Sequence, residues 1–216
     1  MYELLTEISK TIVKLSGTYT PYIIFTDWVK MFALAISNSC ELFHNDIWRK
    51  REDEYMDIAK KYNQTQLDEI VNMGKMLIDF YEQEGPYDAL GEIYMASDCG
   101  NKATGQFFTP FHIAMLTAAV GKYPDNNETF YINEPSCGGG GMILATAKVY
   151  AQRGGNYQKN MKVVAQDIDW NSIYMTYVQL SLNGIDAICV QGNTLMDERP
   201  RAEHIFMTPK NKGALI

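Results

Sequence analysis

The sequence predicts an α/β fold, in which an all-helical region over residues 1–97 precedes a mostly parallel sheet in residues 98–216. In the first region, apolar residues recur at helical spacing. From Thr129 onward, short β-type runs alternate with helical runs, a pattern typical of parallel strands joined by helices. A run of four glycines, Gly138–Gly141, directly follows one of these strands, and a ligand pocket is expected there.

Glycine and proline residues mark where helices end and begin in the helical region. The segment from Gly17 to Pro21 ends one helix and begins the next, and Gly85-Pro86 ends the last long one. The expected helices cover residues 1–16, 21–43, 52–62 and 65–84, with a short helix or turn over 87–95. Turn-forming residues after 96 mark the boundary with the second region.

Two aromatic residues and a predicted helix cap follow this boundary. Thr109 is expected to cap a helix that begins at Pro110 and runs to about Val120. Phe107 and Phe108 stand just before the cap. They can serve as core packing or as the wall of a pocket, and the sequence leaves both interpretations open.

The glycine run lies between a strand over 129–132 and a helix over 142–150. Glycine lets the backbone adopt positive φ angles and approach a ligand closely, and a helix N-terminus offers unpaired N–H groups. A tight turn without a ligand is the alternative, but one glycine would suffice for that. The dinucleotide fingerprint is not met, since it would require glycine where Ile143 stands.

Carboxylates follow the second predicted strand, residues 160–167. Asp167 at its tip is suited to accept both ribose hydroxyls of a nucleoside cofactor, whereas Asp169 can cap the next helix. A third strand is expected at 187–190 and a fourth at 204–207. All candidate site residues would then lie at the C-terminal ends of strands, where ligands bind in parallel sheets.

Composition narrows the class of protein. The chain has 216 residues, 46% of them hydrophobic, which is ample for a globular core. Its net charge of −7 makes it a poor stand-alone binder of nucleic acid, and its basic clusters, such as Arg49–Arg51, are more typical of solvated surface than of DNA contacts. No apolar run approaches membrane-spanning length, and the four cysteines are scattered, so we expect reduced thiols and a cytoplasmic protein.

Three motifs, taken in order, resemble the N6-adenine DNA methyltransferase family, and most closely the modification subunits of type I restriction systems. They are Gly105-Gln-Phe-Phe-Thr-Pro110, Glu134-Pro-Ser-Cys-Gly-Gly-Gly140 and Gln166-Asp-Ile-Asp169. Leu90-Gly-Glu-Ile-Tyr94 also resembles the segment before the catalytic domain in those subunits. The resemblance covers residues 88 to 208 well and implies a partial Rossmann-like, class I S-adenosylmethionine-dependent methyltransferase sheet.

The resemblance also implies S-adenosylmethionine as the cofactor and assigns the residues that would bind it. The segment that would fold over the cofactor consists of Phe107, Phe108, Thr109 and Pro110. The loop around its methionine part and ribose would contain Glu134, Pro135, Cys137, Gly138 and Gly140. Asp167 would bind the ribose hydroxyls, and Asn193 would lie near the adenine. The family commonly has Asp where Glu134 and Asn193 stand. An amide can still hydrogen-bond the adenine, but it lacks the charge.

The fourth strand departs most from the family. The family ends it with Asn/Asp-Pro-Pro-Tyr/Phe, which binds the target amine and stacks on the flipped base. This chain has Thr208-Pro209-Lys210-Asn211, so Thr208 and Pro209 form a degenerate catalytic motif and ordinary catalysis is expected to be impaired. Only four of the family's seven strands can be recognised. If they order as in the family, the fourth strand is left as an open edge for a partner or second copy to cover, and DNA would be reached through such a partner.

Three functions therefore stay open: a DNA adenine methyltransferase that is active alone or with a partner, a catalytically dead binding or regulatory module, and a methyltransferase for another substrate.

Overall fold

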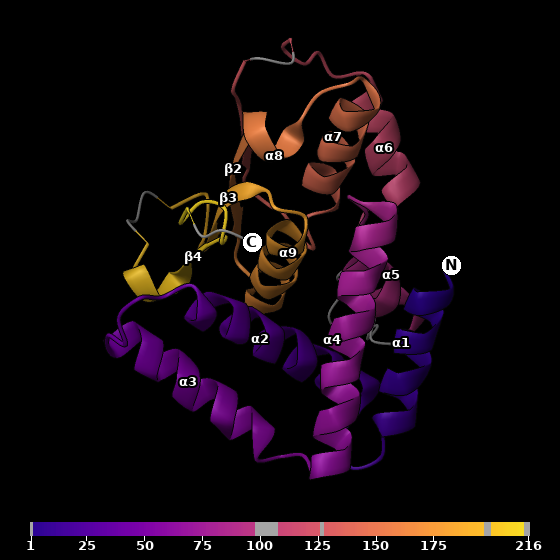
Figure 1. The fold of residues 1–216 in the computed structure, drawn as a ribbon, viewed down its shortest axis with the longest axis vertical. Helices are drawn as coiled ribbons and strands as arrows, with labels where there is room; N and C mark the ends of the chain where they lie inside the picture. The colour runs from indigo at the N-terminus through magenta and orange to yellow at the C-terminus, as the bar shows by residue number, and fades with distance from the viewer. Residues whose placement is uncertain (1, 98–107, 126–127, 197–199, 214–216) are drawn as a thin grey trace.

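The structure is a computed structural model that describes residues 2–97, 108–125, 128–196 and 200–213. It contains the expected helical region and the expected α/β part. In Figure 1 the long helices of the first region (indigo to magenta) lie below and to the right of the sheet and its helices (orange to yellow).

Five helices form the first region: α1 (Glu3–Leu15), α2 (Pro21–Ser39), α3 (Asp46–Ala59), α4 (Gln64–Glu84) and α5 (Ala89–Ala96). Most helix starts carry local signals. The side chain of Thr20 caps α2 ahead of Pro21, and Asn63 and Gln66 form a reciprocal capping box at α4. The third helix begins six residues earlier than residue 52, the start predicted from the sequence, because Asn45 caps it at the backbone N–H of Trp48.

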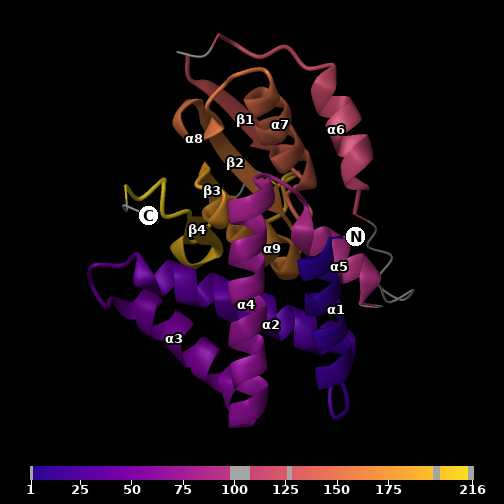
Figure 2. The ribbon, with the colours of Figure 1, turned by 45° about the vertical axis from the view of Figure 1, so that its right-hand side comes forward.

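The α/β part contains strands β1 (Phe130–Glu134), β2 (Met161–Asp167), β3 (Asp186–Gln191) and β4 (Ile205–Met207), and helices α6 (Phe111–Ala119), α7 (Gly141–Gln152), α8 (Tyr157–Asn160) and α9 (Trp170–Leu182). The described strands form one sheet in the order β1-β2-β3-β4, in which the first three are parallel. Figure 2 shows α6 beside α7 at one side of this sheet.

The fourth strand runs antiparallel to β3, so the expectation that its C-terminal end joins the other strand ends was wrong. A parallel strand needs a crossover of a dozen or more residues, usually a helix. Between Gln191 and Ile205, the described residues offer only a one-turn 3-10 helix, Ala202–His204. The chain therefore turns back along β3 instead of crossing the sheet.

The two regions share one hydrophobic core. Helix α9 packs between the sheet and α2, and the ring of Phe206 on β4 lies against the ring of Tyr177 on α9, with their centroids 5.2 Å apart. The Arg51 guanidinium of α3 lies 4.2 Å from the Phe206 ring centroid and donates to the carbonyl oxygen of Ile205 at 2.9 Å. Arg51 is therefore an interior residue and not a surface cation, and residue 97 marks a change of secondary structure within a continuous core.

One face of the sheet is covered by no helix that the structure describes. The connections that contain α7 and α9 both advance in the same direction across the sheet, and right-handed crossovers then place both helices on the same face. The opposite face leaves Tyr131 78% exposed, Val164 42% and Met207 40%. No described strand pairs with the outer edge of β1, so β1 and β4 are the two edges of the sheet.

None of the helices in the described ranges has both the length and the apolar character needed to span a bilayer.

The core shared by β4 and the helical region predicts a large difference between two substitutions on one strand. Phe206→Ala removes a buried ring and should lower the free energy of unfolding by about 3–5 kcal/mol. Met207→Ala, at the exposed neighbouring position, should change it by less than about 0.5 kcal/mol. Urea denaturation measures both values, and equal effects would contradict the packing described above.

Candidate cofactor site at the strand ends

The glycine-rich loop leaves β1 and folds back onto β2. The backbone N–H of Cys137 donates to the carbonyl oxygen of Gln166 at 2.9 Å. Gly138 and Gly140 have φ angles of +53° and +90°, which favour glycine, and α7 begins at the next residue, Gly141. The loop thus places the N-terminus of α7 close to the tip of β2.

Asp167 joins this loop to the tip of β2. One oxygen of its half-buried carboxylate accepts the backbone N–H of Gly138, and the other accepts that of Asp169, each at 2.9 Å. The Asp169 side chain accepts the backbone N–H of Ser172 at 2.9 Å, so its predicted role as the cap of α9 is confirmed. The structure thus places Asp167 directly beside the glycine loop.

The loop after β3 contacts both the glycine loop and the tip of β2. The Thr194 hydroxyl donates to the carbonyl oxygen of Pro135 at 2.6 Å, and the backbone N–H of Gly192 donates to the carbonyl oxygen of Asp167 at 2.9 Å. Asn193 is exposed, and its side-chain oxygen accepts the backbone N–H of Leu195. The ends of β1, β2 and β3 therefore meet, as a parallel sheet requires.

Two other candidate residues on the loop, Glu134 and Cys137, differ in how deeply their side chains are buried. Glu134 is half-buried, and its carboxylate accepts the backbone N–H of Ser136 at 3.3 Å. The side chain of Cys137 is buried in the core, and this burial raises the pKa of its thiol to about 12. The Thr176 hydroxyl on α9 donates to the carbonyl oxygen of Gly138 at 2.8 Å. The Cys137 side chain therefore belongs to the core, and Thr176 is a loop contact that the sequence did not reveal.

The aromatic segment covers the glycine loop. A Cβ atom on Gly138 would lie 3.3 Å from the ring of Phe108, which also packs edge-on against Tyr94. Thr109 and Pro110 are exposed, and Phe107 lies outside the described residues. Helix α6 begins one residue later than expected, with Pro110 in the cap position, so the prediction that Thr109 caps it was wrong.

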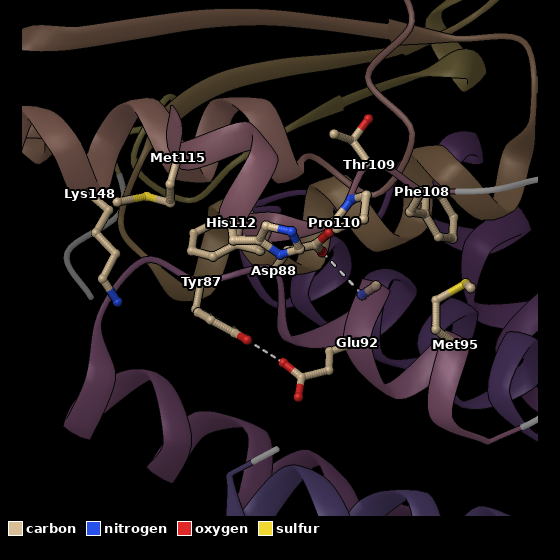
Figure 3. Close-up of a pocket in the computed structure, with 12 residues that line it drawn as sticks. Tyr87, Asp88, Glu92, Met95, Phe108, Thr109, Pro110, His112, Met115 and Lys148 are labelled. Atoms are coloured by element: carbon tan, nitrogen blue, oxygen red, sulfur yellow. Dashed lines mark hydrogen bonds between the residues drawn. The ribbon is translucent and has the colours of Figure 1, made fainter. Parts of the chain in front are cut away.

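A cavity of about 680 Å³ opens on the other side of this segment, between α5, α6 and α7 (Figure 3). Aromatic and methionine side chains make up much of its lining, and the Tyr87 hydroxyl donates to the Glu92 carboxylate within it. Its remaining labelled lining residues are Asp88, Met95, Phe108, Thr109, Pro110, His112, Met115 and Lys148.

Thr208 and Pro209 lie away from this assembly. Thr208 is fully buried, where its hydroxyl donates to the carbonyl oxygen of Ile185 at 2.7 Å and accepts the backbone N–H of Ala187 at 3.0 Å. These partners lie at the start of β3, whereas the glycine loop lies at the strand ends. The structure thus separates the degenerate catalytic motif from the other site residues by the length of β3.

No cluster of potential metal ligands occurs among the residues that the structure describes.

Comparisons with known proteins identify a matching sequence family and a similar fold. The sequence model of the N-6 DNA methylase family matches residues 86–209, which is more than half of the chain. A solved structure from Listeria monocytogenes, described as a class I S-adenosylmethionine-dependent methyltransferase, aligns with a TM-score of 0.56 at 12% identity over 91% of this chain. The type I restriction-modification methyltransferase subunit from Streptococcus thermophilus aligns with a TM-score of 0.45 at 18% identity over 88% of this chain. The chain covers 55% and 43% of those two structures, respectively. No curated protein matches the sequence.

The position of Thr208 predicts that its hydroxyl stabilises the fold. Thr208→Val keeps the shape but leaves the Ala187 N–H without a partner, which should cost about 1–3 kcal/mol of unfolding free energy. Thr117→Val on exposed α6 is the control and should cost less than about 0.5 kcal/mol. Thermal or urea unfolding distinguishes them, and a Thr208 variant as stable as the parent would refute this role.

Burial of the thiols predicts their reactivity. In a Cys99→Ser background at pH 8, half-buried Cys40 should react quickly with a thiol reagent, whereas buried Cys137 and Cys189 should react only as the chain unfolds. Burial raises the pKa of both buried thiols, so little thiolate is present at that pH. The absorbance of the group that the reagent releases counts the reacted thiols, and three fast thiols would contradict the burial of Cys137 in the glycine loop and of Cys189 in β3.

Proposed function

The chain belongs to the N-6 DNA methylase family, and on that premise we propose that it binds S-adenosylmethionine at the ends of β1, β2 and β3. The observation that carries the proposal is the position of Asp167. Its carboxylate holds the glycine loop while lying at the tip of the middle strand of the three. Such a carboxylate retains lone pairs that can accept ribose hydroxyls.

The other residues would divide the cofactor between them. Asn193 would hydrogen-bond the adenine, Glu134 and the loop backbone from Pro135 to Gly140 would surround the ribose and methionine part, and the segment from Phe108 to Pro110 would cover it. The Phe108 ring already packs over Gly138, which supports this arrangement. The cofactor would supply an electrophilic methyl group.

We propose further that catalysis on adenine is impaired or depends on a partner. Thr208 and Pro209 are buried beside the start of β3, and the amide of neighbouring Asn211 donates to the Asp186 carboxylate at 2.6 Å. A group in that position cannot contact an adenine presented to the glycine loop. This placement favours a second candidate function, that of a cofactor-binding or regulatory module without methyl transfer.

The proposed setting is the cytoplasm, with DNA reached through a partner. The described cysteines are free thiols, as a reducing compartment requires. The net charge of −7 opposes DNA binding by the chain alone. A second protein or a second copy would cover the exposed sheet face around Tyr131 and the outer edge of β1.

Calorimetric titration with S-adenosylmethionine tests the cofactor site. The parent chain should bind saturably, and Asp167→Ala should raise Kd at least about 100-fold, because two hydrogen bonds to a charged group are lost. Asp169→Asn, which keeps a helix-capping side chain two residues away, should retain the parent affinity. Equal affinities for the parent and Asp167→Ala would refute the proposed role of Asp167.

Transfer of a radioactive methyl group then separates the candidate functions. We expect the isolated chain to transfer none to DNA even when it is saturated with cofactor. Methylation of DNA by the chain alone would contradict the proposed impairment, and methylation of protein or a small molecule would establish a substrate outside the family's usual class.

A further inference from the structure

Gln179 lies in the middle of α9, and both the nitrogen and the oxygen of its side-chain amide are hydrogen-bonded. Its nitrogen donates to Asp88 at 2.9 Å and to the carbonyl oxygen of Gly139 at 2.5 Å. Its oxygen accepts the backbone N–H of Leu90 at 3.0 Å and the hydroxyl of Tyr81 at 2.5 Å. The side chain is fully buried. One residue therefore connects helices α4 and α5 to the centre of the glycine loop.

These partners fix the orientation of the amide. The backbone N–H of Leu90 can only donate, and the carbonyl of Gly139 can only accept. Reversing the amide of Gln179 would place its NH2 group against the N–H of Leu90 and its oxygen against the carbonyl oxygen of Gly139. The loop carbonyl is thus held in one place by a side chain whose position depends on the helical region.

Asp88 supports the same part of the loop. One oxygen of its buried carboxylate accepts the backbone N–H of Gly91 at 3.0 Å and the amide of Gln179, and the other faces Gly141. A Cβ atom on Gly141 would come within 2.9 Å of that second oxygen, so only glycine allows this approach. The N-terminus of α7 attracts a carboxylate there, although burial raises the pKa of Asp88. Figure 3 shows Asp88 beside the cavity, bonded to the start of α5.

We propose that Gln179 and Asp88 are positioning residues that hold the glycine loop in its binding geometry, so that cofactor affinity depends on the helical region. The claim about cofactor affinity rests on the proposed function. The claim about the geometry of the glycine loop does not, because the exchange of the loop amides can be measured without cofactor.

The main variant is Gln179→Met, which keeps the length of the side chain and removes its hydrogen bonds. The matched control is Leu180→Ala, at the next position of α9, which destabilises the core without touching the loop. Hydrogen exchange of residues 138–141 is measured in the free chain and divided by the exchange of the buried strand β2, which corrects for global stability.

We expect normalised exchange of the loop to be about tenfold faster in Gln179→Met and unchanged in Leu180→Ala, because the Gly139 carbonyl is released. The Kd for S-adenosylmethionine should rise about 10-fold to 100-fold in Gln179→Met and less than about twofold in Leu180→Ala. Equal loop exchange in the two variants would overturn the inference, as would unchanged affinity in Gln179→Met when the parent binds.

Asp88→Asn tests the proposal if Gln179→Met does not fold. It retains the oxygen that contacts Gly91 and Gln179 and places an amide where the carboxylate faces Gly141, so loop exchange should again rise relative to Leu180→Ala. If the parent binds no cofactor while loop exchange responds as expected, the proposed function fails and the positioning role stands. Unchanged loop exchange in Asp88→Asn would refute that role.

Discussion

The carboxylate of Asp167 accepts one backbone N–H from the glycine loop and one from the loop that follows β2, and the candidate site depends on this interaction. Because both oxygens are used, the tip of β2 and the loop after β1 keep a fixed separation. The Thr194 hydroxyl adds the loop after β3 through the Pro135 carbonyl. Three loops are thus held together by a few short contacts, and such preorganisation would favour the proposed ligand binding.

The helical region is connected to the same glycine loop through Gln179. Gln179 carries the connection from α4 and α5 to Gly139, and Arg51 with Phe206 joins α3 to the far edge of the sheet. The glycine loop therefore lies between the sheet and the helices, with contacts to both. A change in how the helices pack would reach the loop through Gln179, whose partners lie on three separate elements of the fold.

Features that are encoded locally could be predicted from the sequence. The glycine loop, the position of Asp167 and the cap formed by Asp169 each follow from a few adjacent residues, and all three were found. The direction of β4 depends on the length of its connection and on distant packing, so a short β-type run could not reveal it. Gln179 lies within an ordinary buried helix, where a glutamine carries no sign of its partners in the helical region, which are 89 to 98 residues away.

The uncovered sheet face also affects how separate molecules behave in solution. Tyr131 and Val164 are exposed near the outer edge of β1, which pairs with no described strand, and such an edge can add a strand from a neighbouring molecule. The net charge of −7 on every copy opposes this contact through mutual repulsion. Added salt shortens the distance over which the charges repel one another. Copies of the chain should therefore associate more readily as ionic strength rises.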